Sequence, residues 1–427
     1  MGLHGKKKRS LRSIFGKITF FRNYYYQEGH SYFLLDARLK LPEHSLSDLL
    51  REWLSQLACY LPYHKSGTLL KNMITQQFFP RPLEEAVLED SALVEAFYQQ
   101  TPPPLPATEA ALLVAQADGK GVPMLAESPK PVRVRLGKGE KPGRKKEAIV
   151  TSIYTIAACV RTPEEVAESL FRQTKHADAR PKKEGRKRSG PQNKRLWATL
   201  CGKEAAISFL AKQVALREGS HLRDRVALTD GSAPLQEKMQ KHLPGFVLIL
   251  DILHALEYLW EAGNSLYGEK SEHRDPWVRE RALLLLRGQT DAVIADLRNL
   301  ANTPRRKKRA KTVLLKVADY YERNQAFMHY DTYLASGWPI ATGVIEGACR
   351  HLVKDRCELS GMHWRVPGAE AVLRLRCVAE NADWERFQAF RRERRQEQLY
   401  GIATAGGIIL EITAAKARVQ SSEHLTA

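Results

Sequence analysis

Three short apolar segments of this 427-residue chain each end on an aspartate. The segments and their aspartates are Ala111–Ala117 with Asp118, Val226–Thr229 with Asp230, and Phe246–Leu250 with Asp251. Short apolar runs of this kind are typical of buried strands. Because strand ends can converge at one edge of a sheet, Asp118 and Asp230 can face each other although they are far apart in the sequence. The sequence therefore predicts an acidic sheet edge.

The neighbouring segments predict the rest of this sheet. Val122–Leu125 is expected to return as a hairpin partner of the first segment, since Asp-Gly is a common turn pair. The β-branched run Glu147–Val160 predicts a third strand. Helices are expected over Leu196–Leu216 and Leu235–Leu243. The resulting order, three antiparallel strands, then helix, strand, helix and strand, predicts an α/β fold with an RNase H-like mixed sheet.

Positive charge is concentrated in three parts of the chain. The sequence has 67 Lys+Arg against 48 Asp+Glu, a formal net charge of +19. Residues 1–24 carry seven basic and no acidic side chains, residues 130–195 carry nineteen basic and seven acidic ones, and residues 305–311 add six basic ones, so the rest of the chain is mildly acidic. Such clusters are typical of proteins that bind nucleic acid, although solvated loops can have the same composition.

Several classes of protein are disfavoured by composition. The longest apolar stretch, Gly245–Trp260, contains charged residues and is too polar to span a bilayer. The basic start at Lys6–Arg9 is not followed by the apolar segment of a secretory signal. The six cysteines form no CxxC pair, which favours reduced thiols over disulfides or a zinc site. We therefore expect a protein that stays inside the cell, in the cytoplasm.

Flanking segments define the expected domains. The aromatic run Ser13–Tyr26 predicts one or two strands, and helices from Ser45 onward, with a turn at Ser66-Gly67, form either a helix-turn-helix or ordinary packing. The Pro-rich run Thr101–Pro106 predicts a linker. The expected parts are an N-terminal DNA-binding region (1–107), a split catalytic core (108–254 and 336–380), an all-helical insertion (255–335), and a C-terminal helix with a flexible tail (381–427).

Glu346 is the strongest candidate to join the acidic edge. It lies between Gly343 and Gly347 at the start of an apolar helix, where a solvated surface position explains it poorly. Three carboxylates at one edge repel each other unless cations neutralise them, and carboxylate oxygens suit Mg²⁺ or Mn²⁺. Two such ions can act on a phosphodiester. Taken alone, Asp118 and Asp230 are more simply explained by turn chemistry.

Other polar residues near these positions have more than one interpretation. Asp251 and His254 share a helical face and form a metal pair, a support for the metal ligands, or a buried hydrogen-bonded pair. Arg350 and Lys354, one and two turns after Glu346, hold a DNA phosphate or belong to a salt-bridged surface. Trp364 stacks on an unpaired base or belongs to the core. Further DNA-binding candidates are the basic residues before the third strand, Arg144, Lys145 and Lys146.

The segments AQADGKGVPM, KKEAIVTSIYT, ALTDG, LDILHALEYLW, WPIATGVIEGACRHLVKDR and SGMHWRVPGAEAVLRLR resemble the DDE transposases of bacterial insertion sequences. The resemblance is closest to the ISKra4 family, which is related to Mutator-like transposases, and it spans roughly residues 10–395. It implies an RNase H-like fold with a helical insertion before the last acidic helix. It also implies Mg²⁺- or Mn²⁺-dependent cleavage at the ends of a mobile element, followed by strand transfer during DNA recombination.

The resemblance further implies roles for single residues. Asp118, Asp230 and Glu346 match the three catalytic, metal-binding acidic residues, which hold two ions, and Asp251 with His254 matches a supporting Asp-x-x-His element. Relatives often carry a cysteine knuckle near the N-terminal strands, whereas this chain has Tyr24–His30 there. Expected partners are double-stranded DNA and a second copy of the chain. The alternatives are an inactive DNA-binding protein on the same fold and a metal-dependent nuclease without strand transfer.

Overall fold

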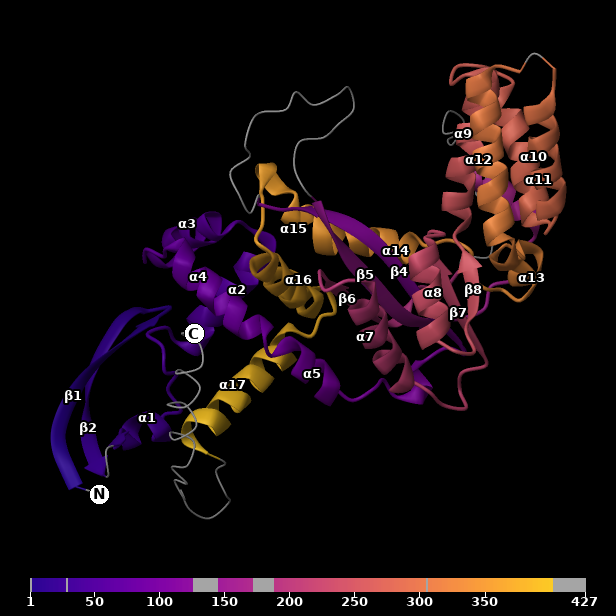
Figure 1. Cartoon of the computed structure of the whole chain (residues 1–427). Coiled ribbons are helices and arrows are strands. Elements are labelled where there is room, and N and C mark those ends of the chain that lie inside the picture. The colour runs from indigo at the N-terminus through magenta and orange to yellow at the C-terminus, as the bar shows by residue number, and fades with distance from the viewer. Residues whose placement is uncertain (1, 28–29, 126–144, 172–187, 305, 402–427) are drawn as a thin grey trace, which may run out of the picture. The chain divides into compact units, whose positions relative to one another are not determined.

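The computed structural model describes residues 2–27, 30–125, 145–171, 188–304 and 306–401. Their contacts divide the chain into two compact units (Figure 1). The first unit comprises the described residues within 1–101, 124–132 and 355–427, and the second comprises those within 102–123 and 133–354. The predicted core segment 336–380 is therefore divided after Lys354. The flexible tail predicted at the end of the chain lies, from residue 402 on, outside the described residues.

The second unit is built on a five-stranded mixed sheet in the order β6-β5-β4-β7-β8. The strands are β4 (Leu112–Pro123), β5 (Lys145–Ile156), β6 (Gln192–Thr199), β7 (Asp224–Thr229) and β8 (Val247–Leu250). β5 is antiparallel to β4 and β6, whereas β7 is parallel to β4 and β8. The predicted strands at 111–117, 147–160, 226–229 and 246–250 correspond to β4, β5, β7 and β8, whereas the predicted separate strand Val122–Leu125 is part of β4.

The predicted hairpin at Asp118-Gly119 is wrong. β4 continues through this pair to Pro123, and Val122 pairs with Lys146 of β5. The long partner strand supplies hydrogen-bond partners for the whole segment, which outweighs the local preference of Asp-Gly for a turn. Asp118 consequently lies within β4. Its contribution to the predicted acidic cluster comes from inside this strand and not from the strand's end.

The predicted helix over Leu196–Leu216 is wrong in its first part. Residues 192–199 form β6, in which Leu196, Trp197 and Ala198 pair with β5 and are buried. The helix α7 begins only at Lys203, after Gly202 at φ +91°. This positive φ is accessible to glycine and ends the strand before the helix.

Helices cover the sheet and form a separate module within the second unit. They are α6 (Pro163–Leu170), α7 (Lys203–Ala215), α8 (Ala233–His242), α9 (Ile252–Tyr267), α10 (Arg274–Leu286), α11 (Thr290–Asn302), α12 (Lys308–Asn324), α13 (Tyr330–Ala335) and α14 (Gly343–Ala348). α9 to α12 run side by side, which confirms the helical pattern predicted there (Figure 1). A π-helical turn, Cys349–Lys354, continues α14.

The two faces of the sheet have different cores. Leu113, Ala115 and Ala117 of β4 pack with side chains of α7 and α8. The alternate positions Leu112 and Val114 belong to the core shared with α9 and the helical module. Since side chains alternate along a strand, Gln116 and Asp118 belong to this second face. α14 packs against β4 and β5.

The first unit combines a small antiparallel sheet with helices from both ends of the chain. Its elements are β1 (Gly2–Ser13), β2 (Gly16–Gln27), β3 (His30–Tyr32), α1 (Leu34–Arg38), α2 (Asp48–Tyr60), α3 (Tyr63–Ile74), α4 (Pro80–Ser91), α5 (Val94–Gln100), α15 (Asp355–Cys357), α16 (Val366–Glu380) and α17 (Trp384–Tyr400). α16 packs against α2 and α4. The predicted turn at Ser66-Gly67 is wrong, because both residues lie within α3 and α2 ends at Tyr60.

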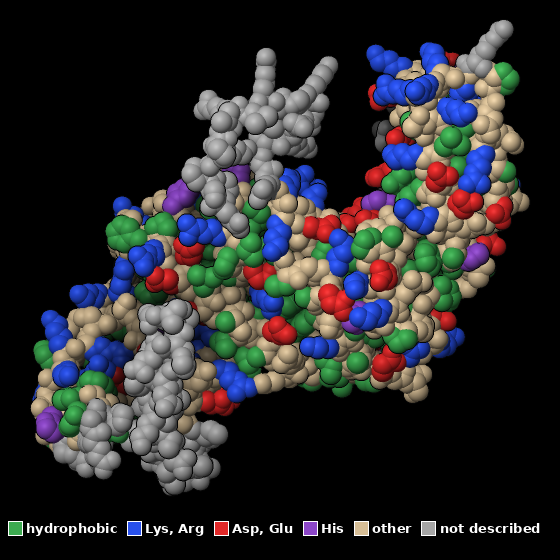
Figure 2. All heavy atoms as spheres, viewed as in Figure 1, with side chains coloured by type: hydrophobic (Ala, Val, Ile, Leu, Met, Phe, Trp, Pro, Cys, Tyr) green, Lys and Arg blue, Asp and Glu red, His purple; other side chains and the backbone are tan. Residues whose placement is uncertain are grey.

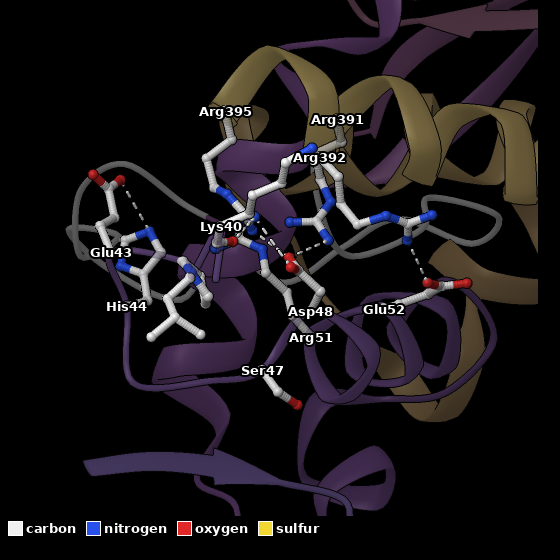
Figure 3. A network of polar contacts seen from close by, with 12 residues as sticks. Lys40, Glu43, His44, Ser47, Asp48, Arg51, Glu52, Arg391, Arg392 and Arg395 are labelled. Atoms are coloured by element: carbon white, nitrogen blue, oxygen red, sulfur yellow. Dashed lines mark hydrogen bonds and ion pairs between the residues drawn. The ribbon is translucent and has the colours of Figure 1, made fainter. Parts of the chain in front are cut away.

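A charged network fixes α17 to the N-terminal helices (Figure 3). Asp48 on α2 accepts hydrogen bonds from Arg391 and Arg395 on α17. Next to it, Arg51 donates to the buried Asp90 of α4 at 2.7 and 3.1 Å. These contacts join segments from opposite ends of the chain into one packed unit. Among the described residues, no helix is both long and apolar enough to cross a membrane.

Candidate metal centre

Adjacent parallel strands bring the predicted aspartates together. In the register of β4 and β7, Gln116 lies opposite Leu228, so that Asp118 and Asp230 each follow two residues later. β7 ends at Thr229, which lies opposite Leu250 of β8, and Asp251 follows directly. The three aspartates therefore occupy neighbouring positions across β4, β7 and β8.

A cavity of about 410 Å³ collects the three predicted metal ligands Asp118, Asp230 and Glu346. The other residues that line it are Gly119, Lys120, His254, Cys349, Arg350 and Lys354. Glu346 comes from α14, and Cys349 to Lys354 from the π-helical turn that follows it. A helix, a strand and the end of a second strand thus supply one carboxylate each to the same space.

Asp118 is held by short local contacts. Its Oδ1 accepts from the backbone N–H of Gly119 at 2.6 Å, and its Oδ2 lies 3.4 Å from the Cys349 Sγ. Burial raises the pKa of the Asp118 carboxyl above its ordinary value, and the nearby Asp230 carboxylate acts in the same direction. Burial also raises the pKa of the Cys349 thiol, so this group remains a neutral donor to Asp118.

Asp251 is fully buried and is the centre of a hydrogen-bond cluster. Its Oδ1 accepts from the backbone N–H groups of Leu253 and Thr342 at 3.1 and 3.2 Å. Its Oδ2 accepts from the Thr342 hydroxyl and the His254 Nδ1, each at 2.7 Å. Each carboxylate oxygen therefore already has two donors. Asp251 joins the start of α9 to the residue that precedes α14, and of the interpretations left open it fits the buried hydrogen-bonded pair.

The Thr342 hydroxyl lies between the carboxylates of Asp251 and Glu346 and can donate a full hydrogen bond to only one of them. It lies 2.7 Å from Asp251 Oδ2 and 3.4 Å from Glu346 Oε1. Because a hydroxyl carries one proton, the shorter contact takes it. Glu346 is therefore weakly held by the protein. Burial raises the pKa of Glu346, and the neighbouring Asp251 carboxylate adds to this effect.

Gln116 positions the helix that carries Glu346. Its Oε1 accepts from the Ile345 backbone N–H at 3.1 Å and lies 3.3 Å from the Ser152 Oγ. Its Nε2 donates to the Tyr154 hydroxyl at 3.2 Å. The Ile345 N–H also donates to the Thr342 carbonyl at 2.9 Å, so it is shared between the helix start and the sheet. Gln116 is fully buried, which fixes α14 against β4 and β5.

His254 faces the cavity as a cation in the metal-free protein. The hydrogen bond to Asp251 is the largest cause that raises the pKa of His254 to about 9, and the Asp251 charge adds to it. The imidazolium partly offsets the repulsion between the carboxylates, since it lowers the pKa of both Asp118 and Glu346.

The donor set of this cavity fits a hard divalent cation. Asp251, His254 and Glu346 bring one potential ligand atom each within 4.8 Å of one another. We assign Asp251 a supporting position instead, because both of its oxygens already accept two hydrogen bonds. The Asp230 carboxylate accepts from the Ser232 N–H at 2.9 Å, and the Tyr320 hydroxyl donates to the Asp230 backbone carbonyl rather than to the carboxylate. Carboxylates that crowd a cavity with few protein donors suit Mg²⁺ or Mn²⁺.

The predicted DNA-binding residues have different outcomes. Arg350 and Lys354 line the cavity with Glu346. Lys145 and Lys146 are exposed at the start of β5 but are not among the described residues that line the cavity. Arg144 lies outside the described residues, as do parts of the basic cluster 130–195.

Trp364 is not available as a stacking surface in this structure. Its ring is 7% exposed, its Nε1 donates to the Cys357 carbonyl at 3.0 Å, and the Arg356 guanidinium lies 4.8 Å from its centre. The side chain belongs to the core of the first unit. Of the two interpretations left open for Trp364, the structure agrees with the core position and not with the base contact.

Four residues of the site were not predicted from the sequence. They are Gln116, Thr342, Lys120 and Cys349. Gln116 had a detectable signal, since it is a lone amide in the apolar run Ala111–Ala117. A buried polar side chain in a strand needs a partner, which would have pointed to a contact across the sheet. The other three have no distinguishing local pattern.

One part of the chain matches a known family model. Residues 2–152 match UPF0236, an uncharacterised protein family. No curated protein matches the chain. Among solved structures, the chain is similar to the "Drosophila P element transposase strand transfer complex", with 10% identity over 87% of this chain and 86% of that chain. The TM-score of 0.25 is too low to support any inference about fold or function.

Proposed function

We propose that the protein is a metal-dependent enzyme that cleaves and joins DNA, of the DDE transposase type. The single observation that carries the proposal is the convergence of Asp118, Asp230 and Glu346 on one cavity that basic residues also line. Carboxylates gathered without an equal number of protein donors favour cation binding. Basic residues around them favour an anionic substrate such as a phosphodiester.

The arrangement of the sheet supports an RNase H-like core. Its order β6-β5-β4-β7-β8 places the first strand of the unit in the centre, with two antiparallel strands on one side and two parallel strands on the other. Three successive strands with antiparallel neighbours, followed by two parallel strands, support an RNase H-like core although β6 was not among the predicted strands, and the helical module between β8 and α14 fits the expected insertion. The fold assignment is part of the proposal.

Asp118, Asp230 and Glu346 would hold two Mg²⁺ or Mn²⁺ ions. Such ions supply Lewis acidity, which activates an attacking oxygen and stabilises a leaving oxygen. Asp251 and Thr342 keep α9 and α14 together, and Gln116 anchors α14 to the sheet. These contacts limit the movement of Glu346 relative to Asp118, which is the preorganisation that an in-line displacement requires.

Basic side chains of the same cavity would hold the substrate. Arg350 and Lys354 lie on the π-helical turn after Glu346, and Lys120 follows Asp118 on β4. In the cleavage step, water attacks the phosphorus and the bridging 3′ oxygen leaves as a hydroxyl. In the joining step, that 3′ hydroxyl attacks a phosphodiester of target DNA and displaces its 3′ oxygen. The proposal includes duplex DNA as partner and at least two copies of the chain on the two ends of an insertion sequence.

A product analysis distinguishes this proposal from its alternatives. Purified protein is incubated with Mg²⁺ and supercoiled DNA that carries the ends of the element encoding it. Joined strands in the product support the transposase, and nicks without joining support a nuclease. Bound but uncut DNA supports a binding protein and would contradict the proposed catalysis.

A further inference from the structure

The N-terminal hairpin has two chemically different sides. β1 and β2 are both 12-residue antiparallel strands, and at roughly 3.3 Å per residue they extend about 40 Å. Residues directly opposite each other share a side. The pairs Lys6/Asn23, Lys8/Phe21, Ser10/Thr19 and Arg12/Lys17 define the outer side, and Lys7/Arg22, Arg9/Phe20 and Leu11/Ile18 define the inner side.

The inner side is used to pack the hairpin against its own unit. Arg9 and Arg22 both form ion pairs with the buried Asp36 of α1. The Arg22 guanidinium also lies 3.5 Å from the centre of the Phe33 ring. Leu11 is buried. These positive charges are therefore already neutralised or covered by the protein.

Within the described part of the chain, the outer side has no such acidic partner. Residues 1–24 contain no Asp or Glu, and Lys6, Lys8 and Lys17 are exposed. Phe21, opposite Lys8, is 66% exposed. The turn end is held in place, since Arg12 donates to the Gln77 carbonyl at 2.6 Å.

Small polar groups lie between the outer lysines. Thr19 and Asn23 are exposed on the same side as Phe21, and the Ser10 and Thr19 hydroxyls lie 3.0 Å apart. Figure 2 shows basic and apolar side chains mixed on the visible side of this hairpin. The outer side thus combines cations for phosphates with hydroxyl, amide and aromatic groups of the kinds that contact base edges.

We infer that the outer side of the β1–β2 hairpin is a contact surface for double-stranded DNA. The inference rests on the proposed function and adds to it the surface that binds the substrate outside the cavity. A two-stranded ribbon is one of the two protein elements that the major groove of B-DNA admits. The occupant is argued from charge complementarity, because a polyanion matches a surface whose charges are all positive.

Two alternative roles for the outer side lead to different experimental results. In the first alternative, the lysines act only to prevent edge-to-edge aggregation of this three-stranded sheet, in which β1 is an edge strand. Exposed aromatic and basic side chains can also bind an anionic membrane surface. Duplex DNA is favoured because Ser10, Thr19 and Asn23 share the side with the lysines, and polar groups of this kind contribute little to insertion among lipids.

The test measures binding of the full chain to a fluorescein-labelled 30-base-pair duplex of arbitrary sequence by anisotropy over a series of salt concentrations. The variants are Lys6→Gln/Lys8→Gln, which removes two charges, and Phe21→Ala, which removes none. The control is Lys212→Gln/Lys270→Gln, which removes two exposed charges from the other unit. All four lysines are exposed, so the substitutions leave the packing unchanged.

The Lys6→Gln/Lys8→Gln variant is expected to bind the duplex more weakly than wild type. The magnitude of its slope of log K against log salt concentration is expected to fall by about two. Phe21→Ala is expected to weaken binding while the slope stays the same, and the control to keep the wild-type slope. The inference is overturned if the salt-dependence slope falls equally in the Lys6→Gln/Lys8→Gln variant and in the control. It is likewise overturned if neither hairpin variant changes the affinity for DNA. It is also overturned if the hairpin variants lose binding only to vesicles of anionic lipid.

Failure of this inference can be separated from failure of the proposed function. If wild-type protein cleaves DNA with Mg²⁺ and the hairpin variants bind duplex as well as wild type does, only the hairpin surface is wrong. If wild-type protein does not bind the duplex at all, both are wrong.

Discussion

Asp251 is a buried acidic residue beside the candidate metal ligands, and its hydrogen bonds distinguish it from them. Its position three residues before His254 correctly predicted that the two side chains meet, since such pairs share a helical face. The sequence could not predict the contacts with Thr342, which comes from a segment 91 positions away. With these contacts, each oxygen of the Asp251 carboxylate accepts two hydrogen bonds. The hydrogen bonds to Thr342, which connect Asp251 to the start of α14, are visible only in the folded structure.

Asp251→Asn is expected to lower the free energy of unfolding by roughly 1–3 kcal/mol. An amide nitrogen in place of Oδ2 accepts no hydrogen bond, so the Thr342 hydroxyl and the His254 Nδ1–H both lose their acceptor. The measurement is the shift of the chemical denaturation midpoint. Glu257→Gln, an exposed change on the same helix, is the control. An unchanged midpoint for Asp251→Asn would contradict the assigned contacts.

His254 is expected to titrate with a pKa of about 9 in metal-free protein, because Asp251 stabilises its charged form. Because the pKa of His254 in the folded protein lies above the ordinary value of 6.5, the His254–Asp251 pair stabilises the fold fully at pH values below 6.5. The contribution is lost as the pH rises through about 9. NMR titration of the His254 ring protons measures the value, and Asp251→Asn should move it back toward the ordinary value. A wild-type pKa near 6.5 would show that the ion pair is not formed.

At the scale of elements, local pattern predicted the strands that are continuous apolar or β-branched runs. β7, α8 and β8 agree with the predicted order, and the aspartates that end β7 and β8 were correctly located. β6 was missed because it begins with the polar residues Gln192–Arg195, and its strand character comes from pairing with β5. The course of β4 was missed for the same reason. Pairing over long distances in sequence has no local signal.

The contact between α2, α4 and α17 depends on Asp90. Asp90→Ala is expected to destabilise the protein by about 3–5 kcal/mol, because it removes the buried charge partner of Arg51, whose other ion pair is with the half-exposed Glu89. Glu85→Ala on the same helix breaks only an exposed pair with Arg81 and should cost roughly 0.5 kcal/mol or less. Thermal denaturation of both variants compares them. Equal shifts would argue against the network as the link between these helices.

At the scale of the whole molecule, composition predicted a polyanion partner but could not say which charges are free. The cluster at residues 1–24 divides between an inner side paired with Asp36 and an outer side with exposed lysines. The sequence also could not predict that residues 355–380 group with the N-terminal region. That grouping depends on α16 packing against α2 and α4, which no motif marks.

Binding of divalent cations should stabilise the protein. Mn²⁺ at 100 times its dissociation constant is expected to add about 2.7 kcal/mol to the free energy of unfolding. The rise in melting temperature should disappear on addition of EDTA and should be absent in Asp230→Asn. Glu257→Gln, whose carboxylate is not among the described residues that line the cavity, should keep it. If Mn²⁺ raises the melting temperature of Asp230→Asn as much as that of wild type, the ion binds outside this cavity.

The most direct test of the account is the rate of Mg²⁺-dependent DNA cleavage in variants of the three carboxylates. Asp118→Asn, Asp230→Asn and Glu346→Gln are each compared with wild type and Glu257→Gln, with binding to labelled duplex measured in parallel. Each of the three substitutions is predicted to reduce cleavage on the order of 10²–10³-fold or more while duplex binding remains. Cleavage at the wild-type rate by any one of them would contradict the proposal that these carboxylates form the active site.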